Sequence, residues 1–201
     1  MTDITRFNEI QSDVRPSIFA SFETSTLTKE SLSEIDTPIT ERVNIRDILK
    51  PLSDESKEAL VEKGYSDSVI EVIGSEEEAK IYTDAELECS NVNGKDALIR
   101  TDVDLDTKDD FGDTNLERMD KGKPPLDSDG KPIELHHIGQ TADAPLAELT
   151  KSEHMSNGND LVLHDKSKES EIDRTSFNKE RAEHWKARVE EIKQNFGTTN
   201  E

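Results

Sequence analysis

Residues 132–140 read PIELHHIGQ and place two adjacent histidines, His136 and His137, in a short apolar segment with the composition of a strand. Successive side chains of a strand point to opposite faces, so the two imidazoles should have different roles, one facing a metal ion and the other a substrate. The turn dipeptide Asp129-Gly130 precedes this segment. We therefore expect a hairpin whose second strand covers residues 133–138.

The chain after this segment predicts a short strand at residues 146–149, followed by helices. Thr150 and Glu153 have the spacing of a capping box, so a helix that carries His154 should begin there. Gly158 should interrupt this helix, and His164 should close it. Residues 176–196 predict a long helix, because apolar residues recur on one face at helical spacing. These residues are Ala182, Trp185, Val189, Ile192 and Phe196.

The chain before the segment predicts smaller elements. Short amphipathic helices are expected at residues 45–63, 66–74 and 75–87, and a strand is expected at 97–105, after the turn dipeptide Asn93-Gly94. Six aspartates between residues 102 and 113 lack the glycine and glutamate of an EF-hand loop, which favours a solvated loop over a calcium site. Residues 1–43 are rich in Ser, Thr, Asp and Glu, and we interpret them as a disordered or linker arm.

The chain has 201 residues and a formal net charge of −21, of which residues 1–120 carry −17 and residues 121–201 carry −4. Such a chain repels nucleic acid overall, so any chemistry on nucleic acid must depend on a metal and on local cations in the second half. Cys89 is the only cysteine, which excludes an internal disulfide. We find no signal peptide or membrane span, and expect a protein that is cytoplasmic when made and does not insert into membranes.

Four histidines lie within 29 residues: His136, His137, His154 and His164. Neutral imidazoles bind transition metals, and three of them leave coordination positions open for water or a phosphate oxygen. The fourth, with an ordinary pKa of about 6.5, is suited to take a proton from an attacking water. Three ligands and one base form a hydrolytic site, for which a phosphodiester is the natural substrate. The remaining histidine, His184, is expected to pack or cap at the long helix.

The context of these histidines resembles the LHH family of the HNH/endonuclease VII (ββα-metal) nuclease superfamily. Members of this family are the toxic modules found at the C-termini of bacterial polymorphic toxins. The likeness covers roughly residues 65–195, and the Leu135-His136-His137 context is its most specific part. Other matching parts are residues 134–140, 144–149, 153–154 and 163–164, with Arg174, Phe177, Arg181 and Trp185. Upstream, residues 70–82, 93–99, 114–119 and 125–127 also resemble what precedes the motif in such toxins.

The resemblance implies an α+β fold of mainly small helices around a ββα-metal (HNH-like) core with a long C-terminal helix. With the arm at 1–43 inferred from composition, we expect an acidic helical and strand region before the nuclease at 44–120, and an HNH/LHH-type nuclease domain at 121–201. The implied activity is that of a metal-dependent endonuclease, a hydrolase of DNA in preference to RNA, which acts as a toxin effector in bacterial competition. A divalent ion (Zn, Ni, Mn or Mg) is the expected cofactor.

Position in the family motif implies that His136 is a metal ligand and His137 the general base, with His154 and His164 as the remaining ligands. Phosphate contacts are expected from Arg174, Arg181 and Arg188 on the long helix and its approach. A solvated Arg181, and a pairing of Arg188 with Glu191 at helical spacing, are the alternatives. Gln140 and Glu148 are expected to orient a ligand imidazole through hydrogen bonds.

A toxin of this kind implies a cognate immunity protein and a secretion or delivery partner that carries it into target cells. The charge asymmetry favours a different interpretation, a non-catalytic acidic binding protein whose first half imitates nucleic acid and whose histidines hold a structural metal. A related interpretation is that the acidic half restrains the nuclease until a partner displaces it.

Overall fold

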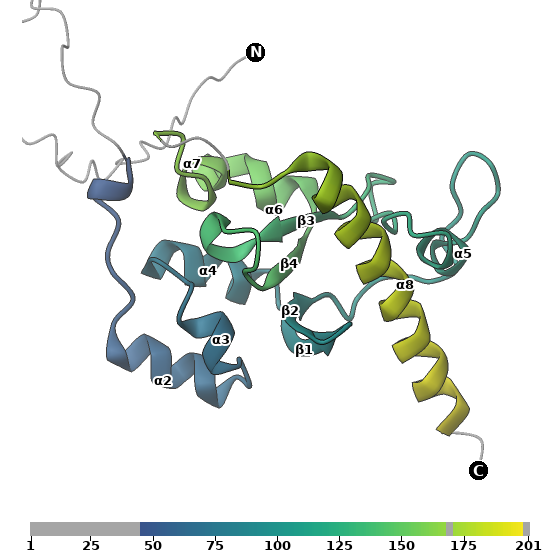
Figure 1. Cartoon of the computed structure of the whole chain (residues 1–201), viewed down its shortest axis with the longest axis horizontal. Helices are drawn as coiled ribbons and strands as arrows, with labels where there is room; N and C mark the ends of the chain where they lie inside the picture. Colours follow the sequence, from purple (N-terminus) through teal and green to yellow (C-terminus); the bar gives the residue numbers. More distant parts are fainter. Residues whose placement is uncertain (1–44, 168–170, 199–201) are drawn as a thin grey trace, which may run out of the picture. The chain divides into compact units, whose positions relative to one another are not determined.

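The computed structural model describes residues 45–167 and 171–198, all within a compact unit, Val43–Glu201. The expected arm at residues 1–43 lies outside the described residues, and the boundary expected after residue 120 lies inside this unit. A four-stranded sheet is combined with short helices and one long helix near the C-terminus (Figure 1). This is the α+β class expected from the sequence. No helix in the described ranges is both long enough and apolar enough to cross a membrane.

The sheet contains β1 (Glu88–Val92), β2 (Lys95–Ile99), β3 (Glu134–His137) and β4 (Leu146–Leu149), in the order β1-β2-β4-β3. Neighbours β1 and β2 are antiparallel, β2 and β4 are parallel, and β4 and β3 are antiparallel. Asn93 and Gly94, both with positive φ, make the turn between β1 and β2, as their dipeptide predicts. Because β3 is last in the strand order, it is an edge strand, and it ends on the histidine pair.

One face of the sheet packs against small helices. Leu98, Ala147 and Leu149 of the strands share a core with side chains such as Tyr82 and Leu163 of the helices. Ser53 and Ser75 accept the N–H groups of residues 56 and 78 and so cap the helices that follow them. The elements on this side are η1 (Ile45–Asp47), α2 (Asp54–Glu62), α3 (Asp67–Ile70), α4 (Glu76–Asp84) and α7 (Asn159–Leu163).

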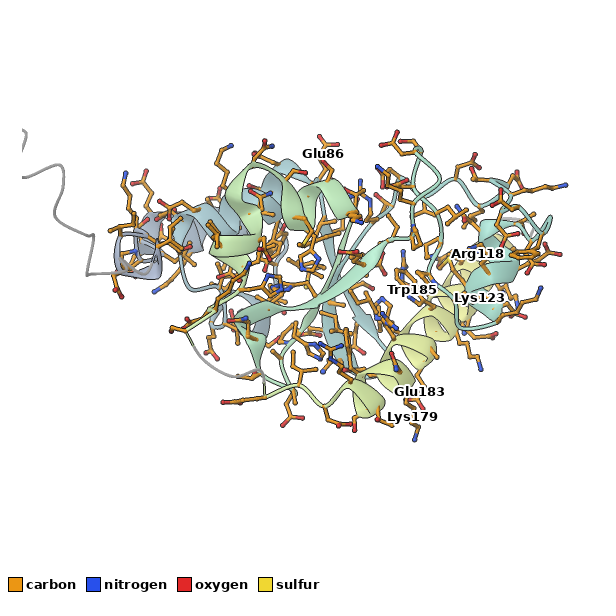
Figure 2. All side chains as sticks on the ribbon, turned by 90° about the horizontal axis from the view of Figure 1, so that it is seen from above. Glu86, Arg118, Lys123, Lys179, Glu183 and Trp185 are labelled. Carbon is orange, nitrogen blue, oxygen red and sulfur yellow. The ribbon has the colours of Figure 1, made fainter. Side chains whose placement is uncertain are left out.

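The other face packs against α5 (Asn115–Asp120) and the long helix α8 (Arg174–Thr198). Figure 2 shows Trp185 on the inner side of α8, whereas Lys179 and Glu183 lie on its outer side. The predicted long helix and its core face are confirmed for Trp185, Val189 and Ile192; the side chain of Phe196 lies outside the described part. The second core comprises Val92, Ala97, Ile99, Ile133, Leu135, Leu146, Met119, Trp185 and Val189.

β3, β4 and α6 (Lys151–Met155) follow one another as a ββα unit. The predicted capping box opens α6, because Thr150 Oγ1 accepts the Glu153 N–H (3.2 Å) and the Glu153 carboxylate accepts the Thr150 N–H (2.7 Å). The 3-10 turn η3 (Ser156–Gly158) separates α6 from α7, with Gly158 at φ 85°. The predicted helix break at Gly158 is confirmed.

Two strand predictions are partly wrong. β2 ends at Ile99 instead of continuing to residue 105, because the Arg100 N–H bonds to the Glu148 carboxylate and the Arg100 carbonyl accepts Arg188, each at 2.9 Å. Arg100 thus directs its backbone groups to side chains, and the chain leaves the sheet. Before β3, pairing is limited to one bridge between Leu126 and Pro132, and β3 pairs with β4 instead.

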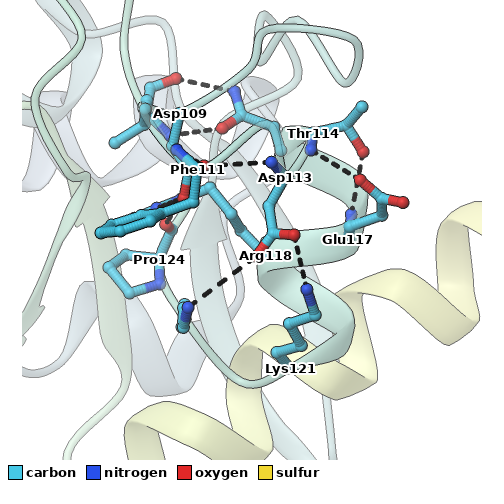
Figure 3. A network of polar contacts seen from close by, with 11 residues as sticks. Asp109, Phe111, Asp113, Thr114, Glu117, Arg118, Lys121 and Pro124 are labelled. Atoms are coloured by element: carbon cyan, nitrogen blue, oxygen red, sulfur yellow. Dashed lines mark hydrogen bonds and ion pairs between the residues drawn. The ribbon is translucent and has the colours of Figure 1, made fainter.

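The aspartate-rich segment forms a loop that protein donors hold in place (Figure 3). One oxygen of Asp109 accepts the N–H groups of Phe111 and Asp113, both at 3.0 Å, and the other accepts Arg118 Nη1 at 2.5 Å. Lys121 pairs with Asp113 at 2.6 Å. These two carboxylates are therefore bound by amides and cations of the chain. The segment is a loop, as expected, but the Asp109 side chain is 7% exposed and so is buried and not solvated.

Gly139, in the tight turn directly after the histidine pair, should be sensitive to substitution. Gly139, in η2 (Ile138–Gln140), has φ 76°, and an added Cβ would lie 3.1 Å from the Val72 carbonyl oxygen. Gly130 has a similar φ of 73° with nothing near its Cβ. In both alanine variants, backbone strain should lower the free energy of unfolding by about 1–2 kcal/mol. We expect a larger loss for Gly139→Ala, because its Cβ also meets the Val72 carbonyl oxygen. Urea unfolding of both variants tests this, and equal losses would contradict it.

Candidate metal centre

Three histidines from separate elements meet at the end of β3. His136 belongs to β3, His154 to α6, and His164 caps the C-terminus of α7. One ring nitrogen of each lies within 4.8 Å of the others. The three ring centroids are 4.9, 5.0 and 5.2 Å apart, with interplanar angles between 52° and 85°. The imidazoles are thus nearly equidistant around one point and are not stacked, which is the arrangement that ligands of a single ion require.

Hydrogen bonds orient two of these rings. His154 Nδ1 lies 2.6 Å from Glu134 Oε2, and His164 Nδ1 lies 3.1 Å from the Asp160 carbonyl oxygen. An ionised carboxylate and a carbonyl only accept, so each Nδ1 carries the hydrogen and each Nε2 keeps its lone pair for a metal.

The donor set fits a divalent transition metal. The Nε2 atom of His154 is buried and makes no hydrogen bond within the described part of the chain. Burial and the neighbouring His154 lower the pKa of His164, which favours the neutral form that binds metal. Imidazole nitrogens in this number suit Zn²⁺ or a similar ion.

His137 faces the opposite side of the sheet from His136. Opposite His136 in the register lies Ala147 of the first core, and opposite His137 lies Leu146 of the second core. His137 Nε2 lies 2.9 Å from Glu180 Oε2 on α8, and its ring centroid is 4.6 Å from that of Phe177. Burial lowers the pKa of His137 against the opposing influence of Glu180, so the ring is neutral near pH 7 and can accept a proton.

A pocket of about 610 Å³ brings both faces together. Because β3 is the edge strand, a side chain from either face of the sheet can line it. Arg174 and Lys166 contribute positive charge to its wall, and Lys166 is paired with Asp160. The three clustered histidines line this pocket together with His137 and Phe177.

Residues 114–191 match a family model described as LHH, a nuclease of the HNH/ENDO VII superfamily with conserved LHH. The matched residues include β3, β4, α6, α7 and the histidines of the pocket. This segment belongs to the LHH nuclease family. No solved structure matches the chain significantly. The LHH segment, residues 114–191, shares its sheet with β1 and β2, which precede it.

The three arginines expected at phosphate lie in different surroundings. Arg174 lines the pocket, and Arg181 stacks on Phe177 with its guanidinium carbon 5.4 Å from the ring centroid. Arg188 is buried, and its three guanidinium nitrogens donate to Glu148 (3.1 Å), Glu191 (2.8 Å) and the Arg100 carbonyl (2.9 Å). Arg174 and Arg181 therefore lie near the histidines of the pocket, whereas Arg188 is bonded to protein groups inside the fold.

The two residues expected to orient a ligand imidazole also have other partners. Gln140 Oε1 accepts the Asp165 N–H at 2.7 Å, so it anchors the chain just after His164. Glu148 accepts His184 Nε2 at 2.7 Å, which agrees with the packing role expected for that histidine.

The groups that orient the histidines of the pocket were not predicted from the sequence. Glu134 lies two residues before His136 on the same strand. Asp160 lies four residues before His164, the C-cap of α7, and its carboxylate is 3.1 Å from His164 Nδ1. Both spacings put side chains on one side of an element, so these two carried a local signal. Glu180 carried none, because it is 43 residues from His137 in the sequence.

The Glu134 contact predicts a weaker metal site when it is removed. Glu134→Gln replaces an acceptor-only carboxylate with an amide, and we expect Zn²⁺ affinity to fall by about 10–100-fold. Competition of the protein with a chromogenic chelator measures this. Glu171→Gln, which removes the same charge from the pocket wall, is the control. Equal affinities of the two variants would argue against the orienting role.

Proposed function

We propose that this protein is a metal-dependent endonuclease of the HNH type that hydrolyses phosphodiester bonds, with His137 as the general base. The observation that supports this most is the pocket in which three nearly equidistant imidazoles lie beside a fourth, that of His137. A divalent ion held by His136, His154 and His164 would stabilise the charge that develops on the phosphoryl oxygens.

The residues of the pocket divide the reaction between them. His137 takes a proton from a water molecule, the water oxygen bonds to phosphorus, and the bond from phosphorus to the leaving sugar oxygen breaks. The leaving oxygen then takes a proton from solvent. Arg174 on the wall of the pocket and Arg181 at its border hold the phosphate by charge.

DNA is the proposed substrate. RNA carries its own nucleophile, the 2′-hydroxyl, so its strand can be cut without an activated water. DNA lacks this group, and cleavage then depends on a base and an electrophile for external water. The combination of His137 with a three-histidine cluster supplies both.

A toxin role is proposed on the family context of the LHH motif. The protein would be delivered into competing bacteria, and an immunity protein would cover the histidine pocket in the producing cell. Induced expression in a bacterium that lacks the immunity protein tests this. Growth arrest by the wild type, but not by His137→Ala at equal abundance, is expected; unaffected growth with active wild-type nuclease would contradict it.

The experiment for the activity compares purified protein on supercoiled plasmid and on a structured RNA, with Mg²⁺, Mn²⁺, Ni²⁺ or Zn²⁺ and with excess chelator. We expect nicked and linear plasmid that disappears with chelator. The net charge of −21 favours a second candidate, an acidic non-catalytic binding protein. Tight binding to a basic partner, with bound metal and no cleavage of either substrate, would support that candidate instead.

A further inference from the structure

A carboxylate from α8 lies between the proposed base and a lysine from the upstream hairpin. Glu180 Oε2 is 2.9 Å from His137 Nε2, and Glu180 Oε1 is 2.5 Å from Lys95 Nζ. The Lys95 and Glu180 side chains are 28% and 29% exposed, whereas that of His137 is only 1% exposed. The three side chains thus form a chain of polar contacts that runs from the half-buried surface to the imidazole.

The carboxylate of Glu180 determines which ring nitrogen of His137 carries the hydrogen. An ionised carboxylate has no hydrogen to give, so Nε2 of a neutral His137 must carry the ring hydrogen. The lone pair then lies on Nδ1. That atom is buried and makes no hydrogen bond to any residue in the described ranges, so it remains available for a proton.

Lys95 holds the second oxygen of Glu180 and so fixes the orientation of this side chain. An ammonium group only donates, so the atom of residue 180 that faces Lys95 must be an acceptor. Lys95 is itself held between Glu180 and the Ala142 carbonyl oxygen, 3.4 Å away. It belongs to β2 and precedes the LHH segment, so this part of the site comes from outside the matched residues.

We propose that Glu180 is a positioning residue that holds His137 in the tautomer with a free Nδ1, and that Lys95 fixes the orientation of Glu180. This rests on the proposed function, in which His137 takes the proton of the attacking water. In this role Glu180 acts only through His137, to which it is bonded at 2.9 Å.

The decisive variant is Glu180→Gln. With Lys95 present, the amide oxygen must face the ammonium, so the amide NH₂ faces Nε2 and donates to it. Nδ1 then carries the ring hydrogen and cannot act as a base. We expect kcat to fall on the order of 100-fold or more, with KM nearly unchanged.

A second substitution should rescue this loss. In Lys95→Met/Glu180→Gln the amide can rotate, its oxygen can accept the Nε2 hydrogen, and the productive tautomer returns. We therefore expect the double variant to be faster than Glu180→Gln alone, although it has lost one more charged group. A merely structural role of the ion pair predicts the reverse order.

The tautomer can be measured without any reaction. Two-dimensional ¹⁵N NMR of the imidazoles in the full-length chain should show His137 with hydrogen on Nε2 in the wild type and on Nδ1 in Glu180→Gln. Glu183→Gln makes the same change three residues further along α8, at a side chain that pairs with Lys179, and should alter neither spectrum nor rate. An unchanged tautomer in Glu180→Gln, or a double variant slower than the single one, would overturn the proposal. A wild type that shows the expected tautomer but cleaves nothing would instead refute the proposed function.

Discussion

His137→Ala should lower phosphodiester cleavage by about 10²–10⁴-fold while the protein still binds metal. The substitution removes the only imidazole of the pocket that lies on the α8 side of the sheet. The three clustered histidines are untouched, because His137 and His136 occupy opposite faces of β3. Initial rates of plasmid nicking, with the metal content of each sample measured, test both parts of this prediction.

His154→Ala is the matched comparison for this variant. It removes one imidazole of the cluster, so metal binding and cleavage should be lost together. Because the His137 ring packs on Phe177, rates are compared at equal folded concentration, with unfolding curves as the check. Wild-type cleavage by His137→Ala would assign the base to another group, and loss of metal from it would place the ring in the cluster.

Glu148→Ala should be the most destabilising single substitution of the polar interior, with a loss of about 3–5 kcal/mol. Glu148 is fully buried and accepts from His184 Nε2 (2.7 Å), Arg188 Nε (3.1 Å) and the Arg100 N–H (2.9 Å). Its removal leaves a buried guanidinium with less compensating charge and two buried groups without an acceptor. Urea unfolding, with the slope compared between proteins, measures the loss.

Glu191→Ala provides the control for this prediction. Glu191 also binds Arg188, at 2.8 Å, but its side chain is 34% exposed. A partly exposed pair of this kind contributes at most about 1 kcal/mol. If Glu148→Ala lowers the free energy of unfolding no more than Glu191→Ala does, the buried hydrogen bonds of Glu148 do not hold α8 against the sheet.

The parts of the fold that local sequence signals determine could be predicted. The Thr150 and Glu153 capping box, the break at Gly158 and the apolar face of α8 depend on residues a few positions apart, and all are present. The histidine pair was likewise informative, because the alternation of a strand separates His136 from His137 whatever the rest of the chain does.

What could not be predicted depends on tertiary contacts. Arg188 has the helical position of a cation at the border of a buried face, yet its partner Arg100 is 88 residues away in the sequence. The same contact ends β2 early, although residues 101–105 continue the alternating pattern. Glu180 and Lys95 are 85 residues apart, so no local pattern connects them.

The most direct test of the account is a metal titration of the stripped protein. The chain is freed of metal with chelator, and plasmid cleavage and bound metal are followed as Zn²⁺, Ni²⁺ or Mn²⁺ is added. We predict that cleavage is absent without metal and rises with occupancy to a limit at one ion per chain. Full cleavage by the metal-free protein, or one bound ion with no cleavage of any nucleic acid, would contradict the assignment of a metal-dependent nuclease.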